Sequence, residues 1–154
     1  MSVRSRTAFC TTLLFLASVG TLPLLWAANA EAEPTREDGV QEIVDESRRR
    51  LGIPEEVRAT VVEGHRFVVS VEPQEDATGA YLLRMDSAFL ETLEDDELRA
   101  AVAHELGHVW IFTHHPYLQT ERLANEIGGR IVARDSLKRL YDKLWRHQRT
   151  TGDL

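Results

Sequence analysis

The sequence predicts an α+β domain in which a small three-stranded sheet packs on two helices. Three observations predict it. Between residues 57 and 85, short segments rich in Val, Phe, Tyr and Leu alternate with turn-forming residues, which is typical of strands. The segment from Asp95 to about Phe112 is dense in helix-forming residues. Beyond it, apolar residues with helical spacing run from Gln119 to about Arg149, so the strands come first and the long helices follow.

Residues 1–30 have the features of a secretory signal peptide. Arg4 and Arg6 supply a positive start, residues 8–26 are apolar and uncharged, and Ala28-Asn29-Ala30 is a small-x-small cleavage site. An exported protein, either periplasmic or secreted, is therefore expected.

The chain is accordingly divided into a signal peptide at 1–30, a polar linker at 31–39 and one folded domain at 40–150. The alternative is an uncleaved anchor, because residues 8–28 are just long enough to cross a bilayer. Membrane attachment is expected only in that case. Cleavage would remove Cys10, the one cysteine, and leave a mature chain without a disulfide.

Composition narrows the classes of partner. The chain has 154 residues, a single-domain length, and a formal net charge of −7. An acidic protein without a long basic run is a poor binder of nucleic acid, so no nucleic-acid partner is expected. The triplet Arg48-Arg49-Arg50 is interpreted as a solvated charge run that suits the C-terminus of a helix.

The first half of the domain is expected to contain one helix and three strands. A helix from Val40 to Leu51 ends at Gly52 and Pro54, where glycine and proline stop it. The strands are expected at Val57–Glu63, Arg66–Val71 and Ala80–Met85, with Glu72–Gly79 as a loop.

The second half is expected to be helical. Asp86 caps a short turn through Leu90, and Asp95 and Asp96 lie where carboxylates cap the next helix. A loop containing Pro116 follows, and then one long C-terminal helix with an expected kink at Gly128-Gly129.

The expected helix over Asp95–Phe112 contains His104-Glu105-Leu106-Gly107-His108. Residues four apart share one face of a helix, so His104 and His108 can occupy two corners of a zinc tetrahedron. Glu105 can hold a water molecule beside the metal and take its proton. This H-E-x-x-H pattern is typical of zinc metallopeptidases.

A catalytic zinc site needs a third protein ligand and an open position. Three candidates follow His108: His114 and His115 in the loop, and Glu121 on the last helix. His114 lies ten residues after His104, where metzincins place their third histidine. Metzincins, however, have glycine at the position of Ile111 and a methionine turn downstream, whereas Met1 and Met85 both lie upstream.

Residues 93–108, L-E-D-D-E-L-R-A-A-V-A-H-E-L-G-H, resemble the active-site helix of gluzincin metallopeptidases of the HtpX-like and CAAX-prenyl-protease group. Residues 121–128, E-R-L-A-N-E-I-G, are similar to the E-x-x-A-D-x-x-G of that group, with Asn125 in place of aspartate. The E-x-x-A-N form and the short spacing are also similar to ImmA/IrrE-type proteases. The chain thus resembles a minimal, zincin-like gluzincin domain.

The resemblance implies one Zn²⁺ per chain, with His104, His108 and Glu121 as ligands and Glu105 as the catalytic base. It implies that Asn125 accepts a hydrogen bond from a ligand histidine. It also implies an edge strand along the cleft that binds an extended peptide or protein substrate, for which Ala80–Met85 is the candidate. Five residues are candidates for stabilising the transition state: His114, His115, Tyr117, Arg130 and Tyr141.

The function expected is zinc-dependent peptide hydrolysis, most simply by a metalloendopeptidase. Glu105 takes a proton from zinc-activated water and returns it to the leaving amine. One alternative is an exported zinc-binding scaffold with the zincin fold and little or no turnover. Another is a structural domain in which the motif is a coincidence.

Overall fold

A computed structural model describes residues 36–74 and 79–151 of the chain. Helix α1 (Arg36–Leu51) is followed by strands β1 (Val57–Val62), β2 (Val69–Pro73) and β3 (Tyr81–Asp86). Four helices complete the fold: α2 (Ser87–Thr92), α3 (Asp95–His114), α4 (Glu121–Gly128) and α5 (Arg134–Thr151). The predicted cleavage site and most of the predicted linker lie outside the described residues, and α1 begins at Arg36.

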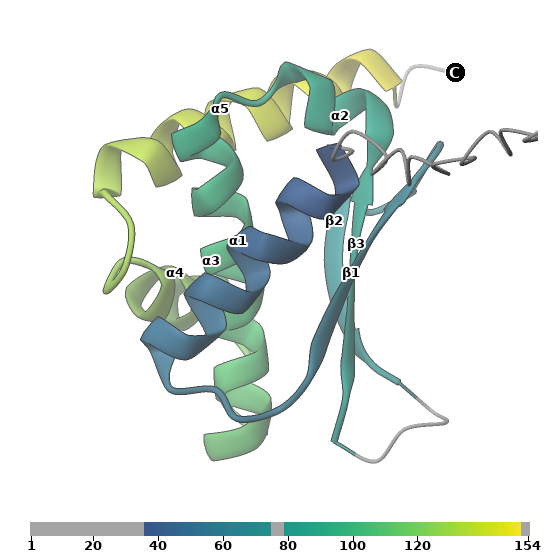
Figure 1. Ribbon diagram of the computed structural model, residues 1–154. Coiled ribbons are helices and arrows are strands. Elements are labelled where there is room, and N and C mark those ends of the chain that lie inside the picture. Colours follow the sequence, from purple (N-terminus) through teal and green to yellow (C-terminus); the bar gives the residue numbers. More distant parts are fainter. Residues whose placement is uncertain (1–35, 75–78, 152–154) are drawn as a thin grey trace, which may run out of the picture. The chain divides into compact units, whose positions relative to one another are not determined.

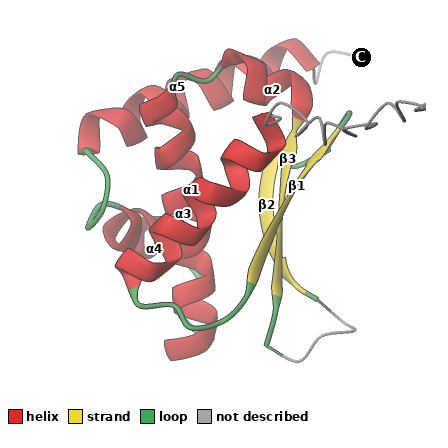
Figure 2. Cartoon of the chain, viewed as in Figure 1, coloured by secondary structure: helices red, strands yellow, loops and turns green. Residues whose placement is uncertain are grey.

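The sheet and the helices form two layers. Figures 1 and 2 show the three strands on one side, with α1 and α3 against the same face. The fully buried large side chains come from α1, β1, β3 and the helices of the second half: Val40, Val44, Val57, Leu83, Met85, Phe89, Val102, Leu106, Val109, Ile111 and Ile127. One hydrophobic core therefore lies between the sheet and the helices.

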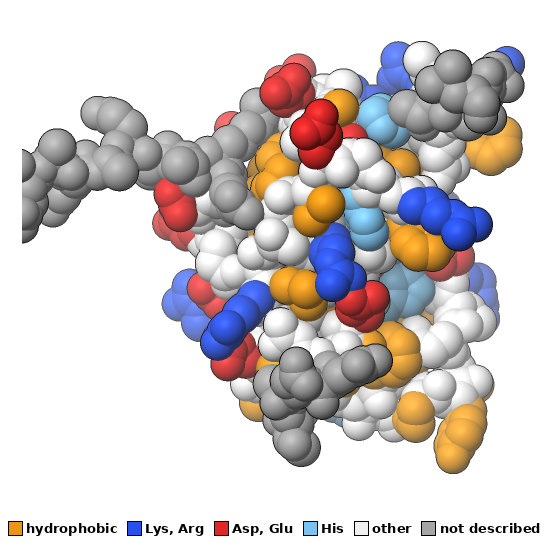
Figure 3. All heavy atoms as spheres, turned by 90° about the vertical axis from the view of Figure 1, so that its right-hand side faces the viewer, with side chains coloured by type: hydrophobic (Ala, Val, Ile, Leu, Met, Phe, Trp, Pro, Cys, Tyr) orange, Lys and Arg blue, Asp and Glu red, His pale blue; other side chains and the backbone are white. Residues whose placement is uncertain are grey.

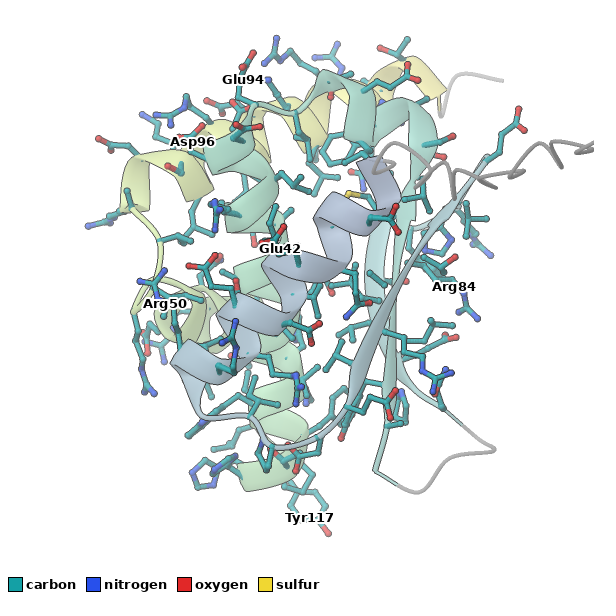
Figure 4. All side chains as sticks on the ribbon, in the orientation of Figure 1. Glu42, Arg50, Arg84, Glu94, Asp96 and Tyr117 are labelled. Carbon is teal, nitrogen blue, oxygen red and sulfur yellow. The ribbon has the colours of Figure 1, made fainter. Side chains whose placement is uncertain are left out.

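The other face of the sheet carries polar side chains. Arg84 of β3 pairs there with Glu72 of β2, and Figure 4 shows Arg84 pointing away from the helices. On the side of the molecule shown in Figure 3, charged side chains are interspersed with apolar ones. Polar side chains on the outer face and buried apolar side chains on the inner face are expected for a sheet that helices cover on one side only.

The strand order is β1-β3-β2, with β3 parallel to β1 and antiparallel to β2. The expectation that Ala80–Met85 forms the edge strand is therefore wrong, because β3 is central and Leu83 and Met85 are fully buried. Of the two edge strands, β1 and β2, it is β2 that lines the cavity described below. Pro73 ends this strand, and proline is tolerated at edges because it has no backbone N–H to donate to a neighbouring strand.

Side chains cap the N-termini of α2, α3 and α4. Asp86 caps α2 as predicted, its Oδ1 accepting from the Phe89 N–H at 2.9 Å. The cap of α3 is Glu94, not Asp95 or Asp96, which occupy its first turn; the Glu94 N–H donates to the Glu97 carboxylate at 2.9 Å. Glu94 and Asp96 both lie at this end of α3 in Figure 4.

The C-terminal segment is two helices and not one kinked helix. Helix α4 ends at Gly128, with Gly129 as its cap, and α5 begins at Arg134. The break lets α4 and α5 cross α3 at different points, which one straight helix could not do. Among the described residues, none of the helices has both the length and the apolar character needed to cross a membrane.

Candidate metal centre

Helix α3 places His104 and His108 side by side at the edge of the core. The ring centroids are 4.9 Å apart. His104 is buried, with 8 % of its surface exposed, and His108 is half-buried. Burial of α3 on most of its circumference holds both imidazoles in place while one side stays open.

Glu121, the first residue of α4, faces both rings. Its Oε2 lies 3.1 Å from His104 Nε2, and its Oε1 lies 3.4 Å from His108 Nε2. Ligand atoms about 2.0–2.1 Å from a tetrahedral zinc ion are roughly 3.3 Å apart, so these separations fit a shared ion. Among the described residues, His104, His108 and Glu121 form the one group of three or more metal-ligating side chains.

Two glycines allow α4 to approach α3 this closely. A Cβ on Gly107 would lie 2.5 Å from the Ala124 carbonyl oxygen, and a Cβ on Gly128 would lie 2.9 Å from that of Ala103. Ala124 itself is fully buried. The small residues in H-E-L-G-H and E-x-x-A-N-x-x-G therefore bring the backbones together, which sets Glu121 against the histidines.

Each histidine is oriented by an amide side chain. His104 Nδ1 lies 3.0 Å from Asn125 Oδ1, and His108 Nδ1 lies 3.1 Å from Gln119 Oε1. Because each amide oxygen accepts from Nδ1–H, each Nε2 is left free to ligate. The contact from Asn125 is the one that the resemblance implied. Gln119 was not predicted; it stands two residues before Glu121 in a loop and belongs to no motif.

Glu105 lies beside the centre, buried against the sheet. Burial, together with the negative charge of Glu121, raises the pKa of Glu105 to about 8, although a backbone hydrogen bond from Val71 of β2 partly opposes the shift. Burial also lowers the pKa of His104, as does the neighbouring His108, so a neutral imidazole is favoured. A cation at the three ligands would favour the charged carboxylate of Glu105.

A cavity of about 380 Å³ opens over these residues. Its polar lining includes His104, Glu105, His108 and Glu121. The apolar part comes from β2 and the turn before it and from α2, α3 and α5: Phe67, Val69, Val71, Phe89, Ala101, Phe112, Leu140 and Leu144. The edge strand β2 thus forms one wall of the cavity.

Of the five candidates for transition-state stabilisation, Tyr141 alone lines this cavity. Its hydroxyl lies 3.4 Å from Glu121 Oε2, and burial raises its pKa, so it keeps its proton near neutral pH. Tyr117 is 97 % exposed and points away from the domain in Figure 4.

The remaining candidates lie near Trp110. His114 stacks on the Trp110 ring with centroids 4.0 Å apart, the His115 ring lies 6.0 Å from it, and the Arg130 guanidinium lies 5.3 Å from it. His114 is not part of the group formed by His104 and His108. The geometry therefore does not favour the metzincin-like alternative.

Comparison with known proteins supports a likeness to metallopeptidases. No family model matches the chain. It is 32 % identical over 100 residues to a protease HtpX homolog of Pyrobaculum calidifontis, a match that includes 62 % of this chain and 26 % of the relative. The chain thus spans about a quarter of that protein's length, and the predicted resemblance to HtpX-like metallopeptidases is confirmed.

The fold is similar to the crystal structure of the metallopeptidase zymogen of Pyrococcus abyssi abylysin. The TM-score is 0.51 at 16 % identity, and the match includes 71 % of this chain and 95 % of the other. At this identity the likeness concerns the fold alone. The predicted α+β, zincin-like fold class is confirmed.

Proposed function

We propose that this chain is a zinc-dependent metallopeptidase of the gluzincin type, with His104, His108 and Glu121 as ligands and Glu105 as the catalytic base. The observation that carries the proposal is the position of the Glu121 carboxylate, at 3.1 and 3.4 Å from the two Nε2 atoms. Two neutral imidazoles and one carboxylate suit Zn²⁺ and leave a fourth position for water.

A zinc ion held there supplies Lewis acidity, which makes a water molecule more acidic and polarises a carbonyl oxygen. The protein supplies the proton transfers. Glu105 accepts the proton of the attacking water and passes it to the nitrogen of the leaving amine. Its buried position beside the Val71 N–H holds the carboxylate against the cavity and away from bulk water.

The substrate proposed is a peptide or protein segment in extended form. It would lie along β2 (Val69–Pro73), the edge strand that lines the cavity, and pair with the strand's backbone. The apolar wall of the cavity favours an apolar side chain near the cleaved bond.

Export through residues 1–30 is also part of the proposal. If cells that express the full chain secrete the protein, its mass will show whether residues 1–30 have been removed.

The experiment is metal content and peptide cleavage of the purified protein, with the Glu105→Gln variant alongside. We expect about one zinc per chain in both proteins and cleavage by the wild type alone, with turnover of the variant lower by at least about 10²-fold. Equal turnover would show that Glu105 is not the base. Zinc without cleavage in the wild type, over a broad peptide library, would favour the zinc-binding scaffold instead.

A further inference from the structure

A path of hydrogen bonds joins two of the proposed ligands through Asn125 and Tyr141. Starting at His104, Nδ1 lies 3.0 Å from Asn125 Oδ1. The other end of the amide, Asn125 Nδ2, lies 2.9 Å from the Tyr141 hydroxyl. That hydroxyl lies 3.4 Å from Glu121 Oε2. The path therefore begins at one ligand and ends at another, and it crosses from α3 to α4 and α5.

The chemistry of the groups gives this path a direction. With Nε2 of His104 directed at the metal position, the proton of the neutral ring is on Nδ1, and Asn125 Oδ1 accepts it. The amide nitrogen then donates to the oxygen of Tyr141. The hydroxyl proton has two neighbours at 3.4 Å, His104 Nδ1 and Glu121 Oε2. Because Nδ1 already carries a proton, the hydroxyl donates to Glu121.

We propose that Tyr141 is a positioning residue: beyond the expected contact of Asn125 with His104, Tyr141 forms a pair with Asn125 whose hydroxyl end also holds Glu121 in the geometry of a metal ligand. An amide can accept from the histidine and donate to the tyrosine at the same time. An aspartate at position 125 could accept from both but donate to neither, and it would draw the hydroxyl proton of Tyr141 away from Glu121. Asparagine and the tyrosine thus suit each other.

Glu121 has particular need of such support. Its side chain is 72 % exposed, while that of His104 is 10 % exposed. A solvent-exposed glutamate on the first turn of a helix has many rotamers open to it, and ordering it opposes metal binding. The hydroxyl of Tyr141, on α5, restrains the carboxylate oxygen that faces His104. The pair therefore acts on metal affinity through the ligands and needs no contact with substrate.

The test is zinc affinity of the full chain, measured by competition with a chelating dye. Tyr141→Phe removes only the hydroxyl, and we expect its dissociation constant for zinc to rise by about 10–100-fold. Tyr117→Phe is the matched control, since Tyr117 is 97 % exposed and should leave the affinity unchanged. The visible absorption spectrum of the Co²⁺-substituted protein should also change in Tyr141→Phe, because it reports ligand geometry and not stability.

Asn125→Asp tests the pairing. In that background we expect Tyr141→Phe to weaken zinc binding by a smaller factor than it does in the wild type. An equal factor in both backgrounds would show that the two residues act independently, which contradicts the proposal.

The outcomes also separate this inference from the proposed function on which it rests. Wild-type zinc affinity and an unchanged cobalt spectrum in Tyr141→Phe would overturn the pair but leave the ligand set in place. Zinc binding without peptide cleavage in the wild type would overturn the peptidase proposal but leave the pair. A wild-type protein that binds no zinc would overturn both.

Discussion

Glu121 lies against the two histidines through both carboxylate oxygens, whereas His114 stacks on the ring of Trp110. Both residues follow His108 closely in the sequence, and spacing alone left both open as third ligands. The stack and the contact of His114 Nδ1 with the Trp110 carbonyl at 2.9 Å keep that imidazole at the C-terminal end of α3. At the scale of single residues, the contacts therefore favour Glu121.

Replacement of the third ligand provides the first prediction. Glu121→Ala removes both carboxylate oxygens and should lower the zinc content from about one per chain to a small fraction of that, because two imidazoles alone hold zinc weakly. His114→Ala, the control, should keep its zinc. Elemental analysis after dialysis measures both. Loss of zinc from His114→Ala with retention in Glu121→Ala would contradict this ligand set.

At the scale of elements, the crossing of α3 and α4 determines whether the ligands meet. Gly107 has the Ala124 carbonyl oxygen 2.5 Å from the position of a Cβ, and backbone atoms cannot move aside as a flexible side chain can. Gly39 of α1 has no atom within 4 Å of such a Cβ. Both glycines are helical, but Gly39 has room for a Cβ and Gly107 does not.

Gly107→Ala should force α4 away from α3. We expect a loss of about 1–3 kcal/mol of unfolding free energy and weaker zinc binding, because overpacking shifts the backbone that carries Glu121. Gly39→Ala should leave zinc binding unchanged and be neutral or stabilising by up to about 1 kcal/mol. Urea unfolding of the metal-free proteins measures the first effect and chelator competition the second. Equal behaviour of the two variants would show that the helix contact is not tight.

Helix α5 is attached to the start of α3 by a buried ion pair. Glu97 has a side chain only 3 % exposed, and its carboxylate meets Lys143 and, at 3.8 Å, Arg139. Burial raises the pKa of Glu97, but hydrogen bonds from Lys143 and from the Glu94 N–H, with the charge of Lys143, outweigh it and lower the pKa below its ordinary 4.5. The charged form is thus favoured in the folded state.

This attachment predicts a pH-dependent stability. A carboxylate with a lowered pKa stabilises the fold above its ordinary pKa, and the contribution is lost as pH falls through the lowered value. Lys143→Met should therefore cost about 1–3 kcal/mol near neutral pH, where it leaves a buried charge poorly paired, and less in acid. Urea unfolding near neutral pH and in acid measures the loss of unfolding free energy under each condition. Lys138→Met, at an exposed position of α5, is the control, and a cost that does not change with pH would contradict the assignment.

The order of the strands also belongs to the scale of elements, and the edge position expected for Ala80–Met85 is wrong. The segment Ala80–Met85 is the candidate for the edge strand that the resemblance to gluzincins implies. It is central because Leu83 and Met85 bury their side chains completely against the helices, while the partner strand β2 ends at Pro73. Proline at the end of a short strand was a local signal for an edge, and it was assigned to a loop instead.

At the scale of the whole molecule, a metal that binds the folded state alone stabilises it. The three proposed ligands come from two helices that meet through tertiary packing, so an unfolded chain has no comparable site. The described residues include no cysteine, so no disulfide holds them together. Stability should therefore depend on zinc.

Removal of zinc by a chelator should lower the midpoint of thermal unfolding of the wild type. Free zinc at about 1,000 times its dissociation constant would contribute about 4 kcal/mol. The same chelator should leave Glu121→Ala almost unaffected, because that variant has no metal to lose. Differential scanning calorimetry measures the shift. Identical shifts in the two proteins would mean that the chelator acts elsewhere.

Helix α3, the capping of α2 and the confirmed α+β class could be predicted from the sequence, because helical periodicity and capping depend on residues a few positions apart. Asn125 was expected to face a histidine because the resemblance to gluzincins implies that contact, and because Glu121 and Asn125, four residues apart, share one face of a helix. Gln119, the edge position of β2 and the separation of α4 from α5 depended on tertiary structure. Each results from segments distant in the sequence packing together, and local patterns contain little information about which distant backbone lies beside them. Tyr141 shows the same limit: it was one of five candidates, and the packing of α5 alone decided which of them reaches the site.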